Sequence, residues 1–209
     1  MQRIFDNANI KALLEFGLGY STKYFLDHCT KVISVEFVTR SIKPDWIKYC
    51  LGLYQDYSNW IPVAYFSNFP GDFSWAPYKF FGISKLYEAE SQYAPGLQSP
   101  TDQAYLVELN TFITNLTKYH KIDLVLVDPP ILLRGPLVQL LFDKAPIILA
   151  HDCHSYFNSA MPDIYGYRRI KVPDNYETIY IDKGKGTLVW IKKTEGNLIQ
   201  VMKEYAASP

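Results

Sequence analysis

Neither sign of charge is in excess in this chain of 209 residues, because 21 Lys and Arg residues balance 21 Asp and Glu residues. Proteins that bind nucleic acid broadly usually carry a basic excess, so this function class is disfavoured. The three cysteines (Cys29, Cys50 and Cys153) are too widely spaced for a disulfide framework or a zinc motif, which indicates a reducing compartment. No apolar run approaches a membrane span, and the first residues lack the apolar core of a signal peptide. We therefore expect a cytoplasmic protein with no membrane association.

Hydrophobic residues are plentiful at 48%, and the length suits one α/β domain over residues 1–209. One segment does not fit a minimal domain of this kind. Residues 68–101 mix prolines, glycines and aromatics, and they are too many for an ordinary connection and too aromatic for a disordered linker. We expect an ordered insertion that serves as a lid, a substrate wall or a homodimer contact, with Trp75 and Tyr78 as substrate-contacting candidates. The alternative is a loop packed on its own aromatic side chains.

The stretch from Ala12 to Glu36 organises the rest of the chain. It predicts a buried strand at 12–16, a turn at Gly17 and Gly19, a helix at 23–28 capped by Ser21 or Thr22, and a strand at 31–37. A β-α-β unit with glycines in its first turn is typical of a nucleotide site. The turn lets a ligand approach the backbone, and an acid near the end of the second strand, here Glu36, can bind both ribose hydroxyls.

The choice of nucleotide follows from what the turn lacks. A dinucleotide site requires G-x-G-x-x-G, but here the third glycine is missing, and Tyr20 and Thr22 crowd the place of a diphosphate. A nicotinamide dehydrogenase is therefore disfavoured. Glu15, just before the turn, would repel a phosphate but would suit an amino group. S-adenosylmethionine has a ribose and an amino acid end but no phosphate.

The run from Glu15 to Thr22, followed by Val35-Glu36, resembles motif I and the ribose-binding acid of the class I S-adenosylmethionine-dependent methyltransferases. Its E-F-G-x-G-x-S-T form is similar to branches that methylate an oxygen of a sugar or small molecule. The resemblance implies a three-layer α/β/α Rossmann-like sheet, mostly parallel with an antiparallel final strand. It also implies an S-adenosylmethionine site formed by Glu15, Phe16, Gly17, Gly19, Ser21, Thr22, Glu36, Phe37 and Asp128.

The remaining pattern agrees with such a sheet. Apolar runs predict strands at 61–67, 122–127 and 146–150, and a hairpin from 177–182 and 187–192. Helical spacing predicts helices within 38–54, at 102–119, at 137–142 and at 197–207.

Polar residues follow two of these strands directly: Asp128 after the first, and His151 and Asp152 after the second. Parallel strands present their carboxyl ends at one edge, so these side chains should converge there. His151 is the first candidate for the general base that takes a proton from a substrate hydroxyl, and Asp128 and Asp152 come next. His154 is a substrate-binding candidate. The alternative is that Asp152 caps a helix and His151 packs at the strand end.

The segment around Asp128 resembles the V-D-G-P and arginine regions of sugar-type O-methyltransferases, with Pro129 in place of the glycine. Arg134 could hold an acidic substrate, orient Asp128 or lie on the surface. Asp128 to Ile131 also resembles the D-P-P-Y motif of methyltransferases that act on adenine. Ile131 replaces the stacking aromatic, so a nucleic-acid acceptor is disfavoured.

A metal is the last open question. Catechol-type O-methyltransferases bind magnesium after the same pair of strands, and Asp128 and Asp152 could supply oxygen ligands. The Asp-Asn pair typical of that group is absent, so magnesium is not expected. The main alternative to an enzyme is a methyltransferase-like fold that has lost catalysis and serves as a binding or scaffold protein.

Overall fold

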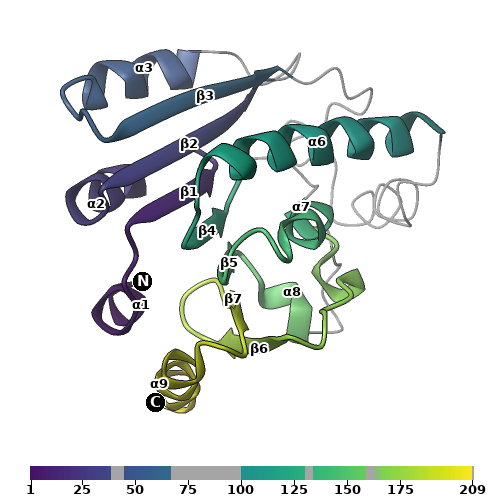
Figure 1. Cartoon of the computed structure of the whole chain (residues 1–209). Helices are drawn as coiled ribbons and strands as arrows, with labels where there is room; N and C mark the ends of the chain where they lie inside the picture. Colours follow the sequence, from purple (N-terminus) through teal and green to yellow (C-terminus); the bar gives the residue numbers. More distant parts are fainter. Residues whose placement is uncertain (39–44, 67–99, 130–133, 159–162, 164, 209) are drawn as a thin grey trace.

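The computed structural model describes residues 1–38, 45–66, 100–129, 134–158, 163 and 165–208 (Figure 1). Seven strands of this part of the chain form one sheet in the order β3-β2-β1-β4-β5-β7-β6. The strands are β1 (Ala12–Phe16), β2 (Lys31–Val38), β3 (Trp60–Phe66), β4 (Leu124–Val127), β5 (Ile147–His151), β6 (Tyr176–Ile181) and β7 (Thr187–Lys192).

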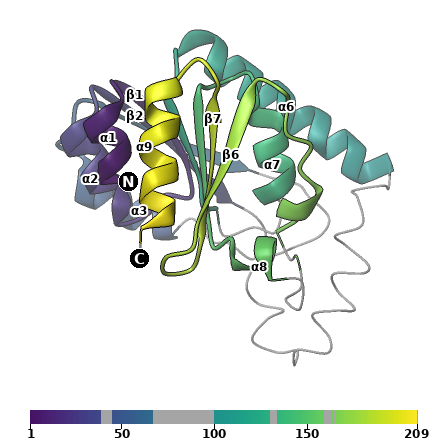
Figure 2. The ribbon, with the colours of Figure 1, turned by 90° about the horizontal axis from the view of Figure 1, so that it is seen from below.

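Helices cover both faces of the sheet, which gives the three-layer architecture predicted from the sequence (Figure 2). Helices α1 (Gln2–Asn7), α2 (Ser21–His28), α3 (Asp45–Tyr54) and α9 (Gly196–Ala207) pack on one face, and α6 (Pro100–Tyr119) and α7 (Arg134–Leu141) pack on the other. The short α8 (His154–Phe157) and the 3₁₀ turn η1 (Tyr167–Arg169) follow β5. Among the described residues, no helix combines the length and hydropathy needed to cross a membrane.

The strand directions confirm the mostly parallel sheet with an antiparallel final strand. Strands β1 to β5 run parallel to one another, whereas β7 runs antiparallel to both β5 and β6. His151 at the end of β5 is paired with Thr187 at the start of β7. The turn between β6 and β7 therefore lies at the same edge of the sheet as the carboxyl ends of the parallel strands.

Two-sided burial explains why the central strands are continuous apolar runs. All five residues of β1 are buried. Leu14 and Phe16 pack with the core under α6 and α7, whereas Leu13 packs with Phe25 of α2 in the opposite core. Successive side chains of a strand point to opposite faces, so each central strand must be apolar at nearly every position.

Several predicted boundaries were wrong. Helix α2 begins at Ser21 with Tyr20 as its N-cap, so neither Ser21 nor Thr22 is the cap. Helix α6 begins at Pro100, so the last two residues of the predicted insertion belong to a helix. Residues 67–99, which hold Trp75, Tyr78 and nearly all of that insertion, lie outside the described part of the chain.

Candidate active site

The glycine turn after β1 passes directly over the end of β4. Gly17 has a φ of +98°, and its N–H donates a hydrogen bond of 3.0 Å to the Val35 carbonyl. A Cβ at this position would overlap the backbone carbonyl of Asp128. Only glycine combines this backbone conformation with so close an approach. The turn and Asp128 are therefore fixed against each other.

Glu36, at the end of β2, contacts the same turn. Glu36 is 3% exposed, and its Oε2 accepts a hydrogen bond of 2.8 Å from the Leu18 N–H. Burial raises the pKa of Glu36 to about 7, and the hydrogen bond from Leu18 opposes the rise. The indole of Trp46 donates to the Leu18 carbonyl at 2.6 Å, and the Tyr54 hydroxyl donates to the Gly19 carbonyl at 3.0 Å. Helix α3 thus holds the turn beside the Glu36 carboxylate.

Glu15 lies beneath the turn and is fully buried. Its Oε1 accepts hydrogen bonds from Thr22 at 2.7 Å and Ser34 at 2.5 Å, and Thr22 in turn accepts from the Gly19 N–H at 3.1 Å. Burial raises the pKa of Glu15 to about 7, although hydrogen bonds from Ser34 and Thr22 counteract it. The other oxygen, Oε2, is buried without a hydrogen-bond partner among the described residues. In this position Glu15 supports the turn through Thr22.

The other predicted cofactor residues lie around this turn at different depths. Phe16 and Phe37 are fully buried, and their ring centres lie 6.1 Å apart in the core under α6 and α7. Ser21 is exposed at the first residue of α2. Ser21 can therefore meet a ligand directly, whereas the two phenylalanines support the strands that carry Gly17 and Glu36.

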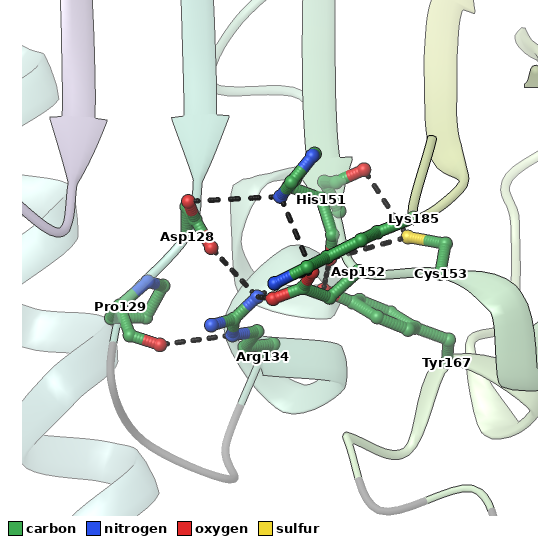
Figure 3. A network of polar contacts seen from close by, with 9 residues as sticks. Asp128, Pro129, Arg134, His151, Asp152, Cys153, Tyr167 and Lys185 are labelled. Carbon is green, nitrogen blue, oxygen red and sulfur yellow. Dashed lines mark hydrogen bonds and ion pairs between the residues drawn. The ribbon is translucent and has the colours of Figure 1, made fainter. Parts of the chain in front are cut away.

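Asp128, His151 and Asp152 come together at the ends of β4 and β5 (Figure 3). The His151 Nδ1 lies 3.4 Å from Asp152 Oδ1 and 3.9 Å from Asp128 Oδ2. The side chain of His151 is 44% exposed, and that of Asp152 is 17% exposed. Lys185, from the turn between β6 and β7, places its Nζ 3.7 Å from Asp152 Oδ1. The expected convergence of these strand ends is therefore present.

Arg134, the first residue of α7, is buried inside this cluster. Its Nη1 lies 2.7 Å from Asp128 Oδ1 and 3.2 Å from Asp152 Oδ2. Its Nε donates to the Pro129 carbonyl at 2.9 Å, and its guanidinium carbon lies 4.2 Å from the centre of the Tyr165 ring. Of the three roles considered for Arg134, this geometry favours orienting Asp128 and disfavours a surface position.

The backbone is strained at Asp152, which adopts a φ of +58°. This left-handed conformation is uncommon for residues other than glycine and is often kept where a side chain must point in one direction. The next residue, Cys153, donates its N–H to the Gly186 carbonyl at 3.1 Å, and the Tyr167 hydroxyl donates to the His151 carbonyl at 2.9 Å. These two hydrogen bonds hold the backbone in place at the end of β5.

A cavity of about 500 Å³ opens beside this cluster, between α1, α2 and α9. Its polar lining consists of Asp128, His151, Ser21, Gln2, Lys183 and Thr187, and mainly apolar side chains from the sheet and the three helices form the rest of its walls. This volume lies in the usual range for small-molecule sites, which are mostly apolar with a few convergent polar groups. The cavity can hold a small organic molecule against the His151 imidazole.

His154 lies apart from this cluster, exposed at the first residue of α8. Its imidazole lies close to Gly186, where a Cβ would come within 2.9 Å of the His154 Cδ2. Tyr165, Tyr167 and Lys185 also contact Arg134 or the end of β5, and no pattern in the sequence predicts them. Each lies in the chain after α8, at least 14 positions beyond the end of β5, and no local motif marks it. Only the folding of the tail against the sheet edge brings these side chains to Arg134 and Asp152.

Neither a protein-family model nor a curated protein matches this chain. Solved structures do. A candidate caffeoyl-CoA O-methyltransferase from Staphylococcus aureus is 16% identical with a TM-score of 0.54, over 91% of this chain and 79% of that one. An O-methyltransferase from Bacillus cereus in complex with S-adenosylhomocysteine (SAH) is 11% identical with a TM-score of 0.52, over 91% and 76%. A methyltransferase from Podospora anserina bound to SAH is 10% identical with a TM-score of 0.52, over 90% and 74%. At these identities the likeness shows the fold alone, which is that of the class I methyltransferases.

Proposed function

We propose that this protein is an S-adenosylmethionine-dependent methyltransferase that transfers the methyl group to an oxygen of a small molecule or sugar. One observation carries the proposal: the glycine turn with Glu36 and the Asp128–His151–Asp152 cluster lie at the same edge of a methyltransferase fold. The structural relatives that are named as O-methyltransferases support the same class.

The residues around the glycine turn fit the cofactor. The Glu36 carboxylate would accept hydrogen bonds from the ribose hydroxyls, and Gly17 and Gly19 would let the ligand lie against the backbone. Ser21 and Asp128 would face the amino acid end, since both border the cavity. Glu15 would act indirectly, because its carboxylate already binds Thr22 and Ser34 below the turn. When bound, the cofactor supplies an electrophilic methyl group on a positively charged sulfur.

His151 is the group best placed to take the proton of an acceptor hydroxyl. Its Nδ1 faces the Asp152 and Asp128 carboxylates, which favours the tautomer with the proton on Nδ1. Nε2 then carries the lone pair that would accept the proton of the acceptor hydroxyl, which leaves the acceptor oxygen free to take the methyl group that a bound cofactor would supply. The remaining contribution to the rate would be proximity, since the cavity would hold the acceptor beside His151.

The test separates cofactor binding from turnover. Calorimetric titration with SAH should show binding, and Glu36→Ala should weaken it. Turnover would be followed as SAH release from S-adenosylmethionine with a panel of phenols, catechols and sugars. His151→Ala should abolish turnover but keep SAH binding, whereas the control His120→Ala, before β4 at the opposite edge of the sheet, should affect neither. Absence of SAH binding would contradict the proposal. Binding without turnover on any acceptor would favour the alternative of a binding or scaffold protein.

A further inference from the structure

The polar cluster contains the ligands for a divalent cation but also a cation of its own. Ligand atoms of Asp128, His151 and Asp152 all lie within 4.8 Å of one another. Carboxylate oxygens and an imidazole suit ions such as Mg²⁺ or Mn²⁺. However, Nη1 of Arg134 lies within ion-pair distance of both carboxylates. A metal that joined Asp128 to Asp152 would meet the positive charge of Arg134, so the site as built does not fit one.

Arg134 cannot easily move out of this position. Its side chain is 3% exposed, and besides the two carboxylates it binds the carbonyls of Pro129 and His151, at 2.9 and 3.3 Å. The Tyr165 ring packs against its guanidinium, where a planar cation is favourable. The guanidinium of arginine is not deprotonated in folded proteins, so the side chain is cationic at every working pH.

The start of α7 is also fixed. The Gly135 N–H donates to the Tyr165 carbonyl at 2.7 Å, and a Cβ at Gly135 would come within 2.5 Å of the Gly166 carbonyl oxygen. Glycine at this position lets the helix begin directly against the 165–166 turn. This contact sets the position of the Arg134 backbone beneath Asp128 and Asp152.

We propose that Arg134 is the resident cation of this site, in place of a divalent metal, and that the protein works without one. Arg134 is then a positioning residue: it holds Asp128 and Asp152 in the orientation in which they face the His151 Nδ1. The part of this inference that concerns turnover rests on the proposed function. The part that concerns cation binding does not, because it follows from the charges and distances alone.

The cation arm of the test is a titration with Mn²⁺, in which the electron paramagnetic resonance signal of the free ion is followed. The unaltered protein should bind no Mn²⁺ at this site. Arg134→Ala removes the buried charge between Asp128 and Asp152 and leaves only the 75% exposed Lys185, 3.7 Å from Asp152 Oδ1, as a cationic neighbour among the described residues, so it should bind Mn²⁺ at least about tenfold more tightly. Adding Asp152→Asn to Arg134→Ala should abolish that binding. The exposed Arg169→Ala loses the same charge elsewhere and should behave like the unaltered protein.

Two variants protect the test against a folding defect. Arg134→Met keeps much of the side-chain volume and should also gain Mn²⁺ binding, whereas Arg134→Lys keeps the charge and should exclude the ion. The proposal would be overturned if the unaltered protein bound Mn²⁺ and Asp128→Asn abolished that binding. Failure of folded Arg134→Ala and Arg134→Met to bind Mn²⁺ would overturn it as well.

The turnover arm uses an acceptor identified in the panel. A chelator should leave the rate of the unaltered protein unchanged, and a rate lost to chelator and restored by Mg²⁺ would overturn the proposal. Arg134→Lys should lower kcat more than it changes KM, because lysine lacks the planar guanidinium whose Nε binds the Pro129 carbonyl while its Nη1 lies between both carboxylates. If no acceptor is turned over at all, the proposed function fails, while the Mn²⁺ titration still decides whether Arg134 occupies a cation site.

Discussion

Replacing Glu36 by Gln should weaken SAH binding and stabilise the free protein at the same time. Glutamine keeps an oxygen for the Leu18 N–H but loses the negative charge. Hydrogen bonds from ribose hydroxyls to a neutral amide are weaker than those to a carboxylate by about 1–2 kcal/mol. We therefore expect SAH to bind about 5- to 30-fold more weakly at pH 8.

The effect on stability has the opposite sign. The pKa of Glu36 rises from an ordinary value of 4.5 to about 7 in the folded protein, because the carboxylate is buried. Between these two values the folded chain keeps a proton that the unfolded chain releases, so its stability falls as the pH rises, and the whole loss is present above pH 7. A shift of this size corresponds to at most about 3 kcal/mol. Glu36→Gln avoids this cost, so its gain in unfolding free energy should appear above pH 7 and vanish below pH 4.5.

Two assays check this reasoning. Urea unfolding at pH 5 and pH 8 should show the gain in stability mainly at pH 8. Calorimetry with SAH at pH 6 and pH 8 should show an affinity that rises about tenfold for the unaltered protein, since binding prefers the carboxylate, and changes less for Glu36→Gln. Asp56→Asn, an exposed carboxylate after α3, is the matched control for charge. Equal SAH affinity of Glu36→Gln and the unaltered protein at pH 8 would refute the assignment of Glu36 to the ribose.

Three further predictions concern the glycine turn. Gly17→Ala should lower the unfolding free energy by about 2 kcal/mol or more, because the added Cβ meets the Asp128 carbonyl and φ is positive. Gly52→Ala, with open space around it in α3, should raise the unfolding free energy by about 0.5–1 kcal/mol. Urea unfolding that ranks the two variants the other way would contradict this description of the turn. Trp46→Phe removes the indole N–H that binds the Leu18 carbonyl and should weaken SAH binding by about 1 kcal/mol in calorimetry, and an unchanged affinity would speak against its role. Thr22→Val should lower the unfolding free energy by about 1–3 kcal/mol by breaking the link from Gly19 to Glu15, while Thr22→Ser, which keeps the hydroxyl, should lose much less.

The sequence predicted the fold well where the signal was local. The β1–turn–β2 unit, the buried strands and the antiparallel β7 follow from apolar runs and glycines that lie within a few residues of one another. The convergence of Asp128 with His151 could also be predicted, because parallel strands end at one edge.

What the sequence did not predict depends on side-chain direction and on distant packing. Glu15 was expected to face the ligand, but β1 directs its side chain beneath the turn, toward Thr22 and Ser34. The role of Arg134 depends on Tyr165, which lies 31 positions later in the chain and is brought there only by tertiary packing. No periodicity or spacing rule contains that information.

The reversal of β7 has a consequence for how such a site can diversify. Because Thr187 is paired with His151, the turn from Asp182 to Gly186 lies beside the candidate base, although it belongs to a simple hairpin at the end of the sheet. Hairpin turns change length without disturbing the strands that they join. This turn is therefore a place where selection or an engineer could alter which acceptors reach His151 while the distant glycine turn after β1 stays intact, provided that the contacts of Lys185 with Asp152 and of Gly186 with Cys153 are kept.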